Sequence, residues 1–185
     1  MRGLWIAVWL GFGGMAAADP YCKPNAAELA ALPGMLAGDW QGQIMQGVAV
    51  QAGVPHVLPA SAAPQQASFL LSTEGLVFSD RMLAQAIVMG QATSKIMPHF
   101  ELPGESVLGP EELLGDALRS ANVDCLAQDL PQFVGQAAMP NGLTATFHSY
   151  ALSADLMLLV MQVGQLGPVA KADGDGARVL MRYTR

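Results

Sequence analysis

The chain carries little charge and no surplus of basic residues. Only 13% of its 185 residues are charged, with 9 Lys and Arg against 15 Asp and Glu, a formal net charge of −6 at pH 7. A nucleic-acid-binding protein needs a basic face, so this balance argues against one. The hydrophobic share of 52% argues against global disorder.

Long apolar runs are absent after residue 18. Arg2, the apolar stretch from Leu4 to Phe12 and the small residues Ala16 to Ala18 together are typical of an export signal, which predicts a signal peptide over residues 1–18. The alternative is an uncleaved anchor, but this apolar stretch is shorter than the ~20 residues of a transmembrane helix. The expected product is exported, periplasmic or extracellular.

Cysteine is scarce, since Cys22 and Cys125 are the only two. In an oxidising compartment an even pair in a small domain is most simply a disulfide. A redox or metal-ligating pair usually has close spacing such as C-x-x-C, which this pair lacks. The sequence therefore predicts a structural Cys22–Cys125 disulfide.

Catalytic signatures are absent as well. No serine lies in a G-x-S-x-G motif, and Ser149 and His148 are neighbours on a predicted strand, where they point to opposite faces. The paired acids Glu111 and Glu112 are explained by the start of a helix. We expect a protein without enzymatic activity or cofactor.

Metal-binding patterns are weak. The three histidines are far apart in sequence. Met97 and His99 form the one close thioether–imidazole pair, which can be interpreted either as core packing or as a Cu(I) site. The acidic run from Asp173 to Gly176 lacks the further ligands of a calcium loop and favours a turn. We predict no metal.

Alternating patterns at both ends of the chain, with a helix between them, predict a mainly β (α+β) fold: an antiparallel curled sheet or barrel with one or two helices around 110–134. Asn25 is the expected cap of a short helix that Pro33-Gly34 ends. For residues 82–100 a helix and two strands both fit, and β-branched residues favour strand over 86–95.

The expected organisation is an N-terminal arm over 19–37 and a single β-rich domain over 38–185, with a helical insertion near 105–135. The predicted strands cover 36–53, 68–72, 75–79, 143–152, 156–163 and 177–183, with a loop over 53–66 and a second short helix over 125–134.

The segment Leu36-Ala-Gly38-Asp39-Trp40, at the start of the first strand after a short helical arm, resembles the opening G-x-W of lipocalins and related calycin β-barrels. The chain closes with ARVLMRYTR, and lipocalins place a late arginine against that tryptophan. The resemblance implies that Trp40 and Arg182 are structural, with the guanidinium stacked on the indole. The chain departs from the pattern because it has no T-D-Y-like motif and places helix over 105–135.

The same resemblance implies a small apolar ligand in the open end of the barrel. The competing interpretation is an interaction or assembly factor of the cell envelope, with Val54–Gln66 as a partner-facing loop and no small-molecule ligand. The candidate lining residues are the larger apolar side chains of the predicted strands, namely Ile44, Val48, Phe69, Leu71, Phe147 and Met161.

Overall fold

The computed structural model describes residues 21–81, 83, 85–92, 110–139, 142–164 and 175–185, and only the backbone of residues 110–113. The predicted signal peptide over 1–18 lies outside the described residues, as do Met97 and His99 and the acidic run at 173–174. Everything said below concerns the described part of the chain.

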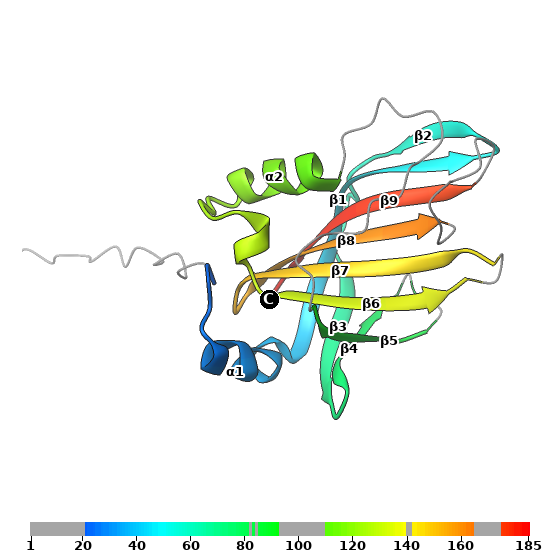
Figure 1. Cartoon of the computed structure of the whole chain (residues 1–185). Coiled ribbons are helices and arrows are strands. Elements are labelled where there is room, and N and C mark those ends of the chain that lie inside the picture. Colours follow the sequence, from blue (N-terminus) through cyan, green and yellow to red (C-terminus); the bar gives the residue numbers. More distant parts are fainter. Residues whose placement is uncertain (1–20, 82, 84, 93–109, 140–141, 165–174) are drawn as a thin grey trace, which may run out of the picture.

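In the described residues, eight antiparallel strands close into a barrel, and a ninth strand lies outside it (Figure 1). The order around the barrel is β1-β3-β4-β5-β6-β7-β8-β9, and β9 pairs back onto β1. Strand β2 extends the sheet beside the second half of β1. The prediction of a mainly β, antiparallel fold is confirmed, and the sheet is closed. The strands are β1 (Gly38–Gln51), β2 (Val54–Leu58), β3 (Gln65–Ser72), β4 (Gly75–Asp80), β5 (Ile87–Gln91), β6 (Gln132–Ala138), β7 (Thr144–Ser153), β8 (Leu156–Gly164) and β9 (Gly176–Thr184).

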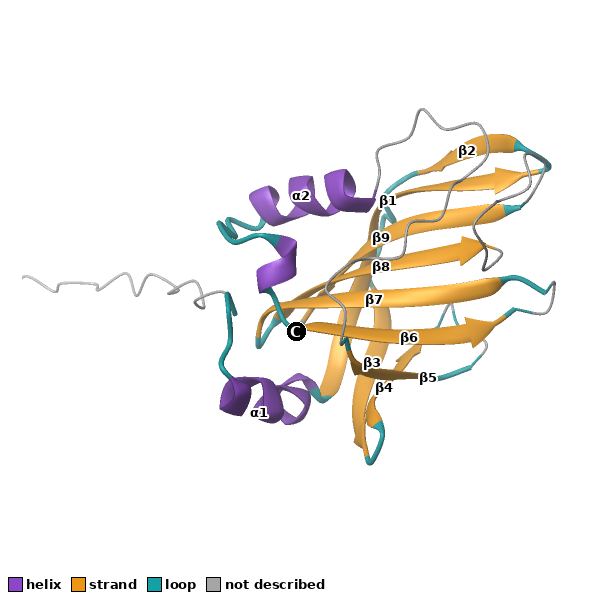
Figure 2. Ribbon diagram, in the orientation of Figure 1, coloured by secondary structure: helices purple, strands orange, loops and turns teal. Residues whose placement is uncertain are grey.

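Alternation along the strands sorts the buried side chains into two cores. Inward residues such as Phe69, Phe147 and Met181 fill the barrel. Outward residues such as Leu158 and Leu180 form a second core on the outer wall of β7, β8 and β9, together with helix α2 (Pro110–Ser120). Figure 2 shows α2 against this outer wall, while α1 lies at one end of the barrel. Strands β7 to β9 are therefore largely buried on both faces.

Helix α1 (Ala26–Leu36) closes the end of the barrel at which β1 begins. The side chain of Asn25 caps it as predicted, accepting from the backbone of Ala27 and Glu28. The predicted stop at Pro33-Gly34 is wrong, because the helix continues to Leu36. Leu32 and Leu36, one turn apart, are buried on the barrel core, and this burial outweighs the helix-breaking tendency of Pro33.

Strand β1 contains a β-bulge at Met45. The register with β9 shifts between Ile44 and Gln46, so two β1 residues oppose one position of β9. Trp40 and Ile44 point into the barrel before the bulge, whereas Val48 faces outward beyond it, opposite Arg178. An extra residue reverses the facing of every position that follows.

Gly42 on β1 is a site of close approach. A β-carbon at this position would lie 2.4 Å from Cε1 of Tyr183, whose ring packs on the glycine inside the barrel. Only glycine leaves room for this ring.

Three local predictions are corrected. Residues 54–58 of the predicted loop form the edge strand β2, in which the unpaired edge tolerates Pro55. The predicted helix over 125–134 is only the 3₁₀ turn η1 (Ala127–Asp129), followed by β6 from Gln132. The preferred strand over 86–95 is observed as β5, Ile87–Gln91, and residues 93–95 are not described.

Candidate functional site

Aromatic rings fill the half of the barrel next to α1. The Phe69 ring stacks on Phe78 at 4.8 Å between centroids, and Tyr183 meets both edge-on at 6.1 and 5.5 Å. Trp40 contacts Phe69 edge-on at 6.0 Å, and its indole Nε1–H donates to the carbonyl of Leu36 at 2.9 Å. This end of the interior is packed and closed.

Arg185 stacks on Trp40. Its guanidinium carbon lies 4.6 Å from the indole centroid, and its Nη2 donates to the carbonyl of Ala37 at 2.7 Å. The resemblance assigned this role to Arg182, but Arg182 points outward from β9 and is exposed. The inward positions of β9 are the odd-numbered ones. Arg182 therefore faces outward, and Arg185, which follows the strand, reaches the indole.

A polar pair is buried among these rings. The hydroxyl of Tyr183 donates to Oδ2 of Asp80 at 3.0 Å and joins β9 to β4 across the interior. Burial and the neighbouring carboxylate together raise the pKa of Tyr183 well above its usual value. Sequence reasoning missed this pair because the two residues are 103 positions apart.

The opposite end of the barrel carries small residues on its inner wall. Five of these inward positions lie level with one another by register, and Gly47 lies one inward position along β1, opposite Val179. We call the six residues the small-residue end: Gly47, Ala49, Ala137, Ala145, Val163 and Ala177. Leu58, Ile44 and Met161 also point inward near this end and are only half-buried. The interior thus changes from bulky aromatic side chains at one end to glycine and alanine at the other.

The six predicted lining residues separate into three groups. Ile44, Phe69, Phe147 and Met161 face the barrel interior, and of these Phe69 and Phe147 are fully buried. Val48 faces outward because of the bulge, and Leu71 is 61% exposed where β3 continues past Gly38, the first residue of β1. Four of the six predicted residues therefore face the barrel interior.

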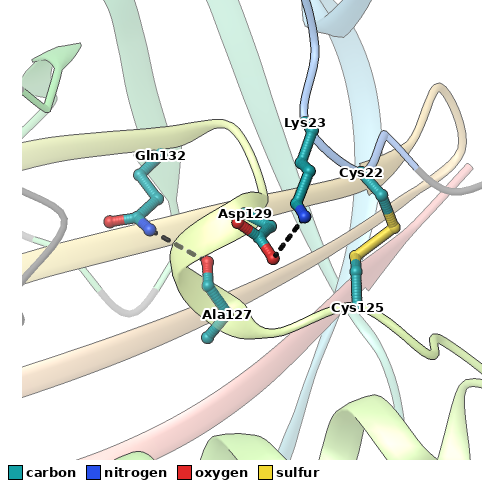
Figure 3. The surroundings of a disulfide bond; sticks show 6 residues. All are labelled: Cys22, Lys23, Cys125, Ala127, Asp129 and Gln132. Atoms are coloured by element: carbon teal, nitrogen blue, oxygen red, sulfur yellow. Dashed lines mark hydrogen bonds and ion pairs between the residues drawn. A yellow bond between two sulfur atoms is a disulfide. The ribbon is translucent and has the colours of Figure 1, made fainter.

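The disulfide ties the N-terminal arm to the segment between α2 and β6 (Figure 3). The predicted Cys22–Cys125 bond is present, with 5.9 Å between the Cα atoms. Beside it, Lys23 N–H donates to the carbonyl of Asp129 at 2.7 Å, and the two side chains form an ion pair at 3.9 Å. The N–H of Tyr21 donates to the carbonyl of Leu152 at 2.9 Å, so the arm is held on both sides of the bond.

His148 is buried on the outer face of β7. Its Nε2 lies 2.9 Å from Oε1 of Gln132, whose Nε2 donates to the carbonyl of Ala127 at 2.9 Å. Because the amide donates to Ala127, its oxygen accepts from the ring, and the proton sits on His148 Nε2. Among the described residues His148 Nδ1 has no hydrogen-bond partner, and the ring stacks on Tyr150 at 4.7 Å. Burial lowers the pKa of His148 to about 4.

We expect His148 to make stability depend on pH. Its pKa is near 4 in the folded chain and about 6.5 when unfolded, so between these values the unfolded state binds more protons. The free energy of unfolding should be constant above pH 6.5 and fall toward pH 4, by an amount on the order of 3 kcal/mol. Urea denaturation at intervals from pH 4 to 8 measures this. The His148→Phe variant should lack this component of the slope, and identical slopes in both proteins would contradict the assignment.

The described residues contain one adjacent serine–histidine pair, Ser149 and His148, on β7. The hydroxyl of Ser149 donates to the carbonyl of Phe133 on the inner face of the barrel, whereas His148 lies on its outer face. The two neighbouring side chains therefore do not contact each other. No group of three His, Cys, Asp or Glu side chains in the described ranges is placed to hold a metal. No helix in this part of the chain has the length and apolar character needed to cross a membrane.

Comparison with known proteins found no matching family model, no matching curated protein and no matching solved structure. The fold and site define a class by geometry: a disulfide-linked, eight-stranded antiparallel barrel that is closed by Trp40 and α1 at one end and lined by small residues at the other.

Proposed function

We propose that this chain is a non-catalytic, lipocalin-like protein that binds a small apolar ligand at the small-residue end of its barrel. The observation that carries the proposal is the change in side-chain size along the interior. An eight-stranded barrel is just wide enough to be filled by side chains or to hold one small ligand. Trp40, Phe78 and Tyr183 fill one half, and the alanines at 137, 145 and 177 do not fill the other to the same extent.

The chemistry of this end supports an apolar occupant. Its inward positions carry no charged side chain, and the half-buried Ile44, Leu58 and Met161 offer aliphatic surface and a polarisable thioether. The disulfide supports export, because such bonds persist in oxidising compartments. We therefore propose that the chain acts outside the cytoplasm, as a carrier or sequestering protein.

Filling the small-residue end should abolish binding there. Ala137→Phe places a ring into the interior, and we expect it to weaken binding of the apolar probe N-phenyl-1-naphthylamine at this end by about tenfold or more. The matched control is Ala138→Phe, because Ala138 is the next residue of β6 and is exposed on the outer face. The probe's fluorescence titration measures both. Equal binding by the wild type and both variants would overturn the proposal.

A row of exposed apolar residues favours a second candidate function, an interaction or assembly factor of the cell envelope. Leu70, Val77 and Val88 are cross-strand neighbours on the outer face of β3, β4 and β5, and Leu70 and Val88 are 57% and 46% exposed. Contiguous exposed apolar side chains are typical of interaction surfaces. If this candidate is right, Leu70→Ser with Val88→Ser should abolish capture of an envelope protein, and Ala137→Phe should not.

A further inference from the structure

A second apolar hollow lies outside the barrel, between α1 and the N-terminal arm. Its volume is about 530 Å³, and nine residues line it. Ala27, Ala31 and Met35 contribute from α1, Tyr21 from the arm, and Pro131 from the segment before β6. This volume falls within the range of ligand pockets, which are mostly apolar with a few polar groups.

The hollow exists because of how the local sequence folds. Ala27, Ala31 and Met35 are four residues apart and share one face of α1, and the two alanines leave space beside the helix. The opposite wall is the arm, which the Cys22–Cys125 disulfide holds against η1 and β6. Met35 is 45% exposed, so an apolar side chain borders the opening.

Charge and size define the occupant. Glu28 is the one charged side chain among the nine lining residues, and its Oε2 accepts from the N–H of Asn25 at 2.8 Å. Its negative charge disfavours an anionic ligand and attracts a cationic one. A protein interface needs roughly 20–30 residues on each side, far more than the hollow offers. The opening lets a polar group remain in water while an alkyl chain lies on the alanines and Pro131.

We infer that this hollow binds a single-chain alkyl amphiphile with a cationic head group, separately from the barrel interior. The alkyl chain lies along Ala27, Ala31 and Met35, and the head group lies near the carboxylate of Glu28. The site requires the disulfide-held arm, which supplies its second wall.

The experiment uses the Ala137→Phe variant, in which the small-residue end is filled, and N-phenyl-1-naphthylamine as fluorescent probe. Ala31→Phe occupies the hollow and should weaken the remaining probe binding by about tenfold or more. Ala30→Phe is the matched control, because Ala30 neighbours Ala31 on the same helix and does not line the hollow. Equal titrations of these two variants would overturn the inference, whatever the outcome for Ala137→Phe.

Competition tests the head group. Dodecylammonium, dodecanol and laurate share a chain length, and below their micellar concentrations they should displace the probe in that order of affinity. Glu28→Gln should weaken dodecylammonium severalfold and leave dodecanol unchanged, because glutamine still fits a capping box. Laurate binding as tightly as dodecylammonium, or no response to Glu28→Gln, would overturn the assignment of the ligand class.

Discussion

Replacing Cys22 and Cys125 together by serine is expected to lower the free energy of unfolding by about 4–5 kcal/mol. The bond joins residues 103 positions apart, and in the chain-entropy model a loop of this length restricts the unfolded chain strongly. Typical domains are stable by roughly 5–15 kcal/mol, so the loss is a large part of the total. Urea denaturation of the oxidised protein and the double variant measures the difference.

The ion pair beside the bond provides the control. Lys23→Ala removes the ion pair with Asp129, in which Lys23 Nζ and Asp129 Oδ2 are 3.9 Å apart and partly exposed to solvent. We therefore expect the free energy of unfolding to fall by less than about 1 kcal/mol. A loss below about 1 kcal/mol for the double serine variant as well would show that the disulfide does not hold the fold together.

Replacing Trp40 by alanine is expected to destabilise the protein by about 3–5 kcal/mol. The indole is only 1% exposed, it packs edge-on against Phe69, and its N–H is bonded to Leu36, so its removal opens a cavity beneath α1 and leaves a carbonyl unpaired. Trp40→Phe retains much of the packing and loses the hydrogen bond, so it should cost less. Equal stability of the wild type and Trp40→Ala in urea denaturation would contradict the closed end described above.

The two arginines closest to the end of the chain offer a matched pair. Arg185→Ala removes a guanidinium that stacks on the indole and donates to Ala37, and should cost about 1 kcal/mol. Arg182→Ala removes an exposed side chain on the outer face and should stay within about 0.5 kcal/mol of the wild type. The reverse order of effects would restore the role that the resemblance gave to Arg182.

The mainly β, antiparallel fold was predictable, because most strands show period-two patterns or apolar runs of strand length, whereas the choice between a curled sheet and a closed barrel was left open. The runs at 143–152 and 156–163 coincide closely with β7 and β8, and the cap at Asn25 has a local signature. Strand β6 was missed although its inward residues Phe133, Gly135 and Ala137 alternate with outward residues, of which Gln132 and Gln136 are polar. The proline at 131 and the glycine at 135 hid that alternation.

The candidate site was only partly predictable, because it depends on contacts that a single sequence does not display. No particular residue type marks the position of the bulge at Met45, yet the bulge turns Val48 to the outer face. The indole of Trp40 was correctly placed in the interior, whereas its cation comes from the chain end at Arg185. The small-residue end requires the strand register, since Ala137, Ala145 and Val163 come from three different strands.

The aromatic end and the small-residue end of the barrel differ in the side chains that line them. Trp40, Phe69 and Tyr183 hold the barrel closed with α1, and the disulfide fixes the arm beside them. In the function that we propose, the small-residue end binds a ligand without loss of this packed core. A rigid scaffold that positions the binding residues is the usual arrangement for a binding site.

The measurement that decides on ligand binding in the barrel is a methyl-detected NMR titration with N-phenyl-1-naphthylamine. We expect saturable shifts of the Ala137, Ala145 and Val163 methyl signals, which line the small-residue end. The outer-face methyl groups of Leu70 should stay unchanged. Unchanged signals from Ala137, Ala145 and Val163 at saturating probe would contradict the proposed function.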